Sequence, residues 1–387
     1  MPPKPTPRSI PIHPVPRRSA EKSRGAVSTP QGRFERDLRE AFDDGWHEEH
    51  EAARPAPTVV TAEEARTILS RNTSPDIPFE LSLNPYRGCE HGCIYCFARP
   101  THAYLELSPG LDFETRIFAK VNAAELLRRE LSRPGHRVSP IALGVNTDAY
   151  QPAERQHRIT RSVLEVLAEC RHPVSLITKS SLIERDIDLL APMAALDLCR
   201  VYISLTTLDH ATARRLDPRA ASPARRIATL RALSRAGIPT GIMVAPVIPA
   251  LNDNALEAVL AAAADAGATS AGYVMLRLPH ELRIVFQDWL AAHFPERAAH
   301  VMSRLRDVRN GRENDPRFGT RMRGTGKFAD LIAQRFAIAC RRSQLNMRER
   351  GAPAGAALDC SKFHPPAVAA GPGHRSPVQP GLFDADQ

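Results

Sequence analysis

Long apolar runs and lysine are scarce in this chain of 387 residues. No apolar run approaches the about 18 to 20 residues needed to cross a bilayer, and the N-terminus lacks the continuous apolar stretch of a secretion signal. Only six of the 52 basic residues are lysine, and seven cysteines at this length do not make a disulfide scaffold. The sequence therefore predicts a globular cytoplasmic protein without a membrane segment, in which clustered cysteines bind metal.

Basic charge is in excess. The formal net charge is +9 and the pI is about 9.5, which indicates a polyanionic partner such as DNA or RNA. Residues 297–350 hold 14 Arg or Lys against 5 Asp or Glu, so their net charge equals the excess of the whole chain. A GC-rich genome would produce an arginine bias without any such partner, and a solvated helical face would also account for the basic residues of the C-terminal part.

Composition divides the chain into four parts. Residues 1–55 are rich in Pro, Arg and Glu and are expected to be a mostly disordered tail, as are the Pro/Gly-rich residues 363–387. Between them, residues 75–295 are expected to form the catalytic domain and residues 296–362 a basic helical extension.

Short β-rich runs alternate with longer amphipathic segments in the central part, which is typical of an α/β fold with a parallel sheet. Strands are expected at 81–87, 141–147, 174–179, 200–206, 240–247 and 271–276. Helices are expected at 122–131, 155–170, 182–190, 223–236, 254–266 and 281–309. Six strand-helix units of this length predict a partial (β/α)6 TIM-like barrel, whose chemistry lies at the carboxyl ends of the strands.

Three cysteines follow the first expected strand. Cys89, Cys93 and Cys96 form a C-x3-C-x2-C arrangement in NPYRGCEHGCIYCFARPTH. Thiolates suit iron-sulfur clusters and zinc, and a four-iron electron carrier normally uses four cysteines. The next cysteine, Cys170, is 74 residues downstream. Three local thiolates would leave one iron of a 4Fe-4S cluster open to a small-molecule ligand.

The motif, with Tyr95 before its third cysteine, resembles the radical S-adenosylmethionine superfamily, and within it the spore photoproduct lyase-like proteins and their bacterial relatives. Further stretches that carry the resemblance are GVNTDAYQPAE (144–154), SLITKS (175–180), VYISLTTLD (201–209) and GIMVAPVIPALND (241–253). The resemblance implies a 4Fe-4S cluster and S-adenosyl-L-methionine as cofactors, cleavage to a 5′-deoxyadenosyl radical, and a flavodoxin- or ferredoxin-type reductant. It also implies DNA repair as one candidate role.

By this resemblance, several residues near the strand ends are expected to hold the cofactor. The backbone of Tyr95 would contact the adenine, Lys179 the methionyl carboxylate, and Ser204 the ribose or methionyl group. Asn146, Thr147 and Asp148 are candidates to bind the methionyl ammonium or the substrate, and Val244 to form part of an apolar wall against the adenine. Each also fits an ordinary structural role: a turn or helix cap, an exposed charge, or core packing.

Substrate contacts are expected from Tyr150, Gln151 and Glu154, which follow the second strand, and from Arg277 and His280, which follow the sixth. The spore lyases use a cysteine near the end of the second strand to return a hydrogen atom, and this chain has none there, which puts the lyase reaction itself in doubt.

A second hypothesis is a basic nucleic-acid-binding protein in which the cysteines hold a structural zinc, completed by His91 or His102. Structural zinc sites usually pair two C-x2-4-C elements or add a His pair, and neither pattern is present.

Overall fold

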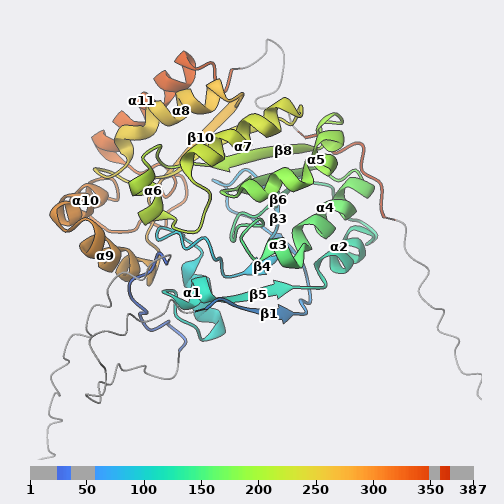
Figure 1. The fold of residues 1–387 in the computed structure, drawn as a ribbon, viewed down its shortest axis with the longest axis horizontal. Coiled ribbons are helices and arrows are strands. Elements are labelled where there is room, and N and C mark those ends of the chain that lie inside the picture. Colours follow the sequence, from blue (N-terminus) through green and yellow to red (C-terminus); the bar gives the residue numbers. More distant parts are fainter. Residues whose placement is uncertain (1–23, 36–56, 348–357, 367–387) are drawn as a thin grey trace, which may run out of the picture.

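The computed structural model describes residues 24–35, 57–347 and 358–366 (Figure 1). Most of the two expected tails lies outside the described residues. Residues 24–35 are an exception to the expected N-terminal tail, because Ala26 and Val27 are buried against the folded chain. Residues 358–366 also pack on the body, where the N–H of His364 donates to the carbonyl oxygen of Cys170 at 3.0 Å.

Six parallel strands form the main sheet, as expected. In spatial order they are β10 (Ser270–Met275), β9 (Thr240–Val247), β8 (Cys199–Ser204), β7 (Val174–Thr178), β6 (Ile141–Leu143) and β3 (Leu81–Leu83). A seventh strand, β2 (Leu69–Arg71), pairs antiparallel with β3 and precedes the expected domain start at 75. The predicted partial (β/α)6 barrel is confirmed, and its edge is extended by β2.

The connections between these strands are helical and cover the sheet in Figure 1. The longer helices among them bury apolar residues and so pack against the sheet. The elements are α2 (Ala123–Leu131), α3 (Glu154–His157), α4 (Ile159–Glu169), η2 (Ser181–Asp186), α5 (Ile187–Ala194), α6 (His210–Leu216), α7 (Pro223–Arg235), η3 (Asp253–Ala255) and α8 (Leu256–Asp265).

Four expected elements are broken, and the strand expected at 141–147 ends at Leu143, before Gly144 with its φ of 79°. The helix expected at 182–190 divides into the 3-10 helix η2 and the helix α5. The strand expected at 81–87 ends at Leu83, because Pro85 cannot donate to a ladder. The helix expected at 155–170 is interrupted by Arg158, whose φ of 52° is left-handed. The helix expected at 281–309 divides into α9 (Leu282–His293) and α10 (Pro295–Asp307), and Pro295 begins the second helix.

A second, three-stranded sheet was not expected from the sequence. Strand β5 (Arg116–Lys120) lies between β1 (Val59–Glu63), which is parallel to it, and β4 (Tyr86–Arg87), which is antiparallel. Between β4 and β5 come the 3-10 helix η1 (Arg99–Leu105) and the short helix α1 (Asp112–Thr115). This sheet and its two helices support the segment that carries the cysteines.

Helix α11 (Gly326–Arg342) packs on α8 and leads to Asn346. The Asn346 side chain accepts from Ala271 N at 2.8 Å and donates to Ala271 O at 3.0 Å, so it occupies the open edge of β10. The C-terminal region therefore closes one edge of the barrel. No helix of the described residues is long and apolar enough to cross a membrane.

Candidate functional site

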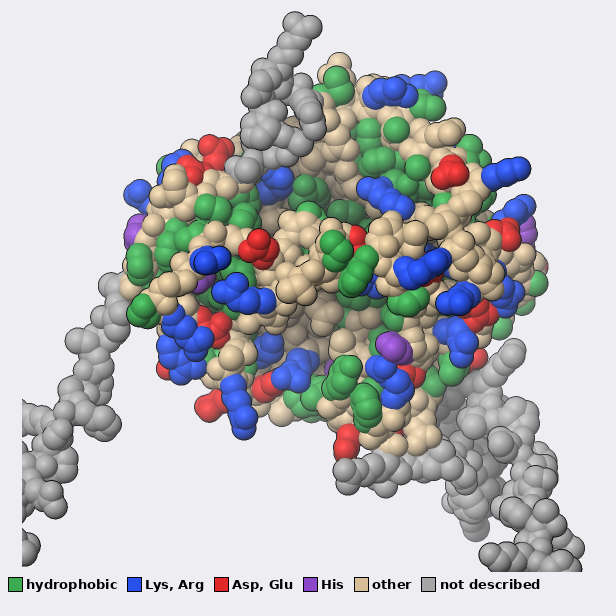
Figure 2. All heavy atoms as spheres, turned by 180° about the vertical axis from the view of Figure 1, so that it is seen from behind, with side chains coloured by type: hydrophobic (Ala, Val, Ile, Leu, Met, Phe, Trp, Pro, Cys, Tyr) green, Lys and Arg blue, Asp and Glu red, His purple; other side chains and the backbone are tan. Residues whose placement is uncertain are grey.

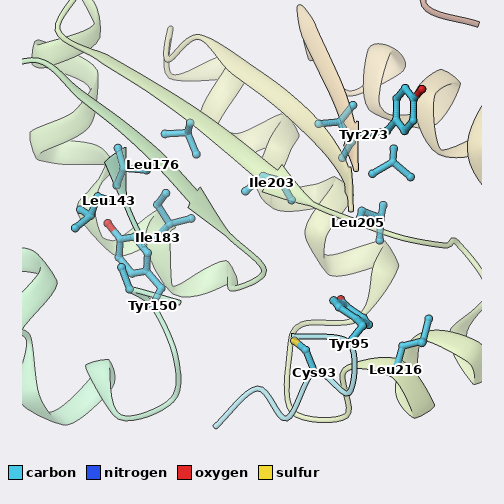
Figure 3. Close-up of a cluster of buried hydrophobic side chains, with 14 of the residues drawn as sticks. Cys93, Tyr95, Leu143, Tyr150, Leu176, Ile183, Ile203, Leu205, Leu216 and Tyr273 are labelled. Carbon is cyan, nitrogen blue, oxygen red and sulfur yellow. The ribbon is translucent and has the colours of Figure 1, made fainter. Parts of the chain in front are cut away.

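The three cysteines lie on one loop at the carboxyl end of β3. This cysteine loop, residues 88–98, faces the ends of the parallel strands, and Figure 3 shows Cys93 and Tyr95 on it beside Leu216. Its first residue, Gly88, has a φ of 75°, and a Cβ there would lie 2.9 Å from the carbonyl oxygen of Arg116. Only glycine fits this start of the loop without displacement.

All three cysteine thiols are free and lie near one another. Cys89 and Cys93 are buried and Cys96 is half-buried. Burial raises the pKa of Cys89 well above its ordinary value, and charges on the other two cysteines would raise it further. Burial also raises the pKa of Cys93 to about 12, although Lys179 opposes the change. Burial therefore favours the neutral thiols of Cys89 and Cys93, and a cationic centre would be needed to hold these two as thiolates.

Gln151 fixes the first part of the cysteine loop. Its side chain is fully buried and spans Cys89: Oε1 accepts from Glu90 N at 3.0 Å, and Nε2 donates to Gly88 O at 3.1 Å. The residue was expected to contact substrate. That contact stays a prediction, and the observed hydrogen bonds show that Gln151 holds the backbone on both sides of Cys89.

The segment after α6 fixes the middle of the loop. Ile94 N donates to Leu216 O at 2.9 Å, and Arg219 N donates to His91 O at 3.2 Å. Next to them, Asp217 forms a buried ion pair with Arg226, which places charged groups close to Cys93.

Asp148 connects two strand ends to the cysteine loop. Its Oδ1 accepts from Thr178 Oγ1 at 2.7 Å and from Tyr150 N at 2.9 Å, while Oδ2 accepts from Lys179 N at 2.8 Å and lies 3.2 Å from His91 Nδ1. Burial opposes ionisation, but the charges and hydrogen bonds of His91 and Lys179 hold the pKa of Asp148 well below its ordinary value. Its contact with the cofactor stays a prediction.

The two residues before Asp148 are also bound to the chain. Asn146 N donates to Asn84 Oδ1 at 2.9 Å, and Thr147 Oγ1 donates to Tyr86 O at 2.8 Å. Both contacts attach the end of β6 to the segment that enters the cysteine loop. The Asn146 side chain is half-buried, and its predicted cofactor contact is untested.

The remaining cofactor candidates lie on or directly after three consecutive strands, β7, β8 and β9. Lys179 Nζ lies 5.9 Å from the ring centre of Tyr95. Burial would lower the pKa of Lys179, but a thiolate at Cys93, as a bound cluster would require, and the carboxylates of Asp148 and Asp217 raise it overall, so the ammonium is kept. Ser204 ends β8, and Val244 lies in the neighbouring β9; both are buried.

The other substrate candidates are placed differently. Tyr150 is in the core (Figure 3), and the carboxylate of buried Glu154 accepts a backbone N–H in the first turn of α4 at 3.0 Å. Arg277 is near the cysteine loop, with its Cζ 5.7 Å from the ring centre of Phe97. His280 lines a cavity of about 640 Å³ beside the start of α9.

A family model described as the radical SAM superfamily matches residues 83–263. An uncharacterised protein of Mycobacterium tuberculosis is 39% identical over 261 residues, which cover 67% of this chain and 75% of that protein. The chain belongs to the radical SAM superfamily. A second uncharacterised relative, from Methanocaldococcus jannaschii, is 27% identical over 171 residues, covering 44% of this chain and 61% of that protein.

Among solved structures, the radical SAM chain resembles spore photoproduct lyase complexed with dinucleoside spore photoproduct. The TM-score is 0.53 at 13% sequence identity, and the match covers 73% of this chain and 79% of the lyase. A mutant of that lyase gives a TM-score of 0.52 at 15% identity. Likeness at this identity shows a shared fold and leaves the reaction open.

The donor set suits the iron-sulfur cluster that radical SAM proteins carry. A four-iron cluster binds each thiolate at a different iron, so its ligands need not converge on one point. A single zinc ion does require convergence, and within ranges 24–35, 57–347 and 358–366 no three His, Cys, Asp or Glu side chains form such a group. His102 Nε2 lies 2.9 Å from Arg116 O, so that side chain supports β5 instead.

Sequence reasoning missed two buried residues that pack against the cysteine loop. Arg99 and Glu114 are each 0% exposed and form an ion pair. Arg99 follows the motif by three residues, and Glu114 lies in a region for which no element was expected. The only signal was an arginine in an otherwise small and apolar stretch, which by itself does not distinguish a buried from an exposed side chain.

Proposed function

We propose that this radical SAM enzyme binds a 4Fe-4S cluster through Cys89, Cys93 and Cys96 and reductively cleaves S-adenosyl-L-methionine. The observation that carries the proposal is the set of three neighbouring thiols on a loop fixed to the strand ends. When bound, such a cluster supplies the electron that cleaves the sulfonium to a 5′-deoxyadenosyl radical. An external donor of flavodoxin or ferredoxin type would reduce the cluster.

The chain's own residues would orient the cofactor. Lys179 keeps its ammonium beside the cysteine loop and offers an ion pair to the methionyl carboxylate. Ser204 offers a hydroxyl at the end of β8, and Val244 an apolar surface on β9. Tyr95 is buried within the cysteine loop and so limits the access of water to the loop.

Anaerobic reconstitution, followed by measurement of 5′-deoxyadenosine in the presence of dithionite, tests the proposal. The full chain should take up about four iron atoms and form 5′-deoxyadenosine. Replacement of any one of Cys89, Cys93 or Cys96 by Ala should abolish both. Cys360→Ala, on the segment 358–366, is the matched control and should behave as the wild type. A fully loaded cluster with intact cofactor would contradict the proposal.

A nucleic acid is our candidate substrate. The net charge of +9 supports it, and a structural neighbour is complexed with a dinucleoside photoproduct. The described arginines of the basic C-terminal region give less support, because Arg306, Arg317, Arg321 and Arg335 form internal ion pairs. Figure 2 shows basic side chains dispersed among acidic and apolar ones on one face.

A salt titration of oligonucleotide binding distinguishes a nucleic-acid substrate from a small molecule. Phosphate contacts release counterions, so the affinity for DNA or RNA should fall steeply as salt rises. Weak binding that is independent of oligonucleotide length would favour a small-molecule substrate and leave the cofactor chemistry unaffected.

A further inference from the structure

A fully buried carboxylate lies behind the cysteine loop. Glu114, on α1, has no exposed surface, and neither has its partner Arg99. Burial of two charges is costly unless each is paired and its remaining hydrogen-bonding groups are satisfied. The partners of both side chains therefore show what the pair holds in place.

Arg99 holds the backbone of the cysteine loop. Its Nε donates to Cys93 O at 2.8 Å, and Nη2 donates to Gly92 O at 3.1 Å. On the other side, Nη1 donates to Gly110 O at 2.9 Å. One guanidinium thus connects the loop, at a cluster ligand, with the segment that leads into α1.

The N-terminal segment, residues 24–35, supplies the other donors to the carboxylate. Gly25 N donates to Glu114 Oε2 at 2.9 Å, and Ala26 N donates to Glu114 Oε1 at 2.8 Å. Farther along the segment, Arg33 forms an ion pair with Glu281 at 2.7 Å. In Figure 1 the segment, in dark blue, runs beside α1 and α9.

The contact between the segment and the loop is also close sterically. A Cβ added to Gly25 would lie 1.7 Å from Gly92 O, a distance that no packing adjustment of side chains can relieve. At Gly92, whose φ is 69°, an added Cβ would lie 2.8 Å from Glu114 Oε2. The segment, the carboxylate and the loop are therefore in close contact at Gly25 and Gly92.

We propose that Glu114 is a positioning residue for the cysteine loop, acting through Arg99, and that docking of residues 24–35 is coupled to cluster loading. The inference rests on the proposed function in one respect, that the loop binds a cluster. If docking favours the loaded form of the loop, loading must favour docking by the same factor.

Amide hydrogen exchange on the full chain tests the coupling. With the cluster loaded anaerobically, the N–H groups of Gly25 and Ala26 should exchange at least about tenfold more slowly than in the cluster-free chain. Equal exchange in the two forms would overturn the inference. Failure of the wild-type chain to load any cluster would overturn the proposed function instead, so the two failures are distinguishable.

Gly25→Ala tests the same contact without changing Glu114 or Arg99. The added methyl group should displace the segment, lower the iron bound at limiting iron by at least about threefold, and alter the EPR line shape of the reduced cluster. Gly135→Ala is the control for general destabilisation: its φ of 78° makes the substitution strained, but nothing lies within 4 Å of a Cβ there, so iron loading and line shape should be those of the wild type. Wild-type loading and line shape in Gly25→Ala would contradict the inference.

Glu114→Gln tests the carboxylate itself. In the wild type Gly25 N and Ala26 N donate to different oxygens of the carboxylate, and in the variant an NH2 group, which cannot accept, replaces one of them. Exchange at these two groups should therefore become faster even with cluster present. Glu257→Gln removes the carboxylate from another Arg–Glu pair, between α8 and α11, and should leave exchange at the N-terminal segment unchanged. Unchanged protection in Glu114→Gln would show that the carboxylate does not hold the N-terminal segment, which would overturn the coupling.

Discussion

Gln151 offers a sharp test of how the cysteine loop is held. In Gln151→Ala, Gly88 O and Glu90 N lose their partners while remaining buried beside Cys89. A buried group left without its hydrogen bond costs about 1–3 kcal/mol, and two such groups cost about 2–6 kcal/mol. The vacated volume adds to this cost.

The penalty should fall mainly on the loaded form. Without a cluster, the loop of Gln151→Ala can open and let water reach Gly88 O and Glu90 N. Closing the loop on a cluster would remove that water again. If cluster binding becomes less favourable by about 3 kcal/mol, the affinity for the cluster falls by about 100-fold, because each 1.4 kcal/mol is a factor of about ten.

Iron and sulfide content after anaerobic reconstitution over a range of iron concentrations measures this loss. Gln156→Ala is the control, since Gln156 is exposed on the short helix α3 and should load as the wild type. Gln151→Glu keeps an acceptor for Glu90 N but sets a carboxylate against Gly88 O, so it should also load poorly. Wild-type loading curves for both Gln151 variants would refute the reasoning.

Three further predictions concern other parts of the chain. Lys179→Met should weaken S-adenosyl-L-methionine binding by about tenfold in equilibrium dialysis while leaving iron content unchanged, because it removes a charge and no cluster ligand. Asn346→Ala should lower the free energy of unfolding in urea by about 1–3 kcal/mol, since Ala271 N and O at the β10 edge lose their hydrogen-bond partners. Cluster loading should be unaffected. Unchanged stability would show that the two hydrogen bonds of Asn346 do not stabilise this edge. Burial lowers the pKa of His172 to about 4, so below about pH 6.5 the unfolded chain binds a proton that the folded chain does not. The free energy of unfolding should therefore fall by up to about 3 kcal/mol as the pH is lowered from about 6.5 towards 4. His172→Phe should remove most of that loss; His136, which lies 3.3 Å from His172 and also has a lowered pKa, would account for the part that remains.

Local sequence patterns determined the barrel. Four of the six parallel strands begin and end within two residues of the expected ranges, and β3 and β6 end four residues earlier than expected. The agreement arises because alternating β-rich and amphipathic segments must pair their strands and cover them with helices. The expected helix at 223–236 matches α7, since Ser222 caps it and Pro223 begins it. The spacing of the three cysteines similarly sufficed to indicate the family, because the ligand set is contained in one short loop.

Long-range contacts decided the rest. Strands β1 and β5 pair across more than 50 residues, and neither has a strong pattern of its own. The function of Gln151 depends on its approach to Gly88 and Glu90, which are 63 and 61 residues away in the chain. Composition suggested that residues 24–35 were part of a tail, but Glu114 provides a buried acceptor for their backbone. The sequence specifies which groups can donate or accept hydrogen bonds. Only the tertiary structure determines which of these groups become buried and pair with one another.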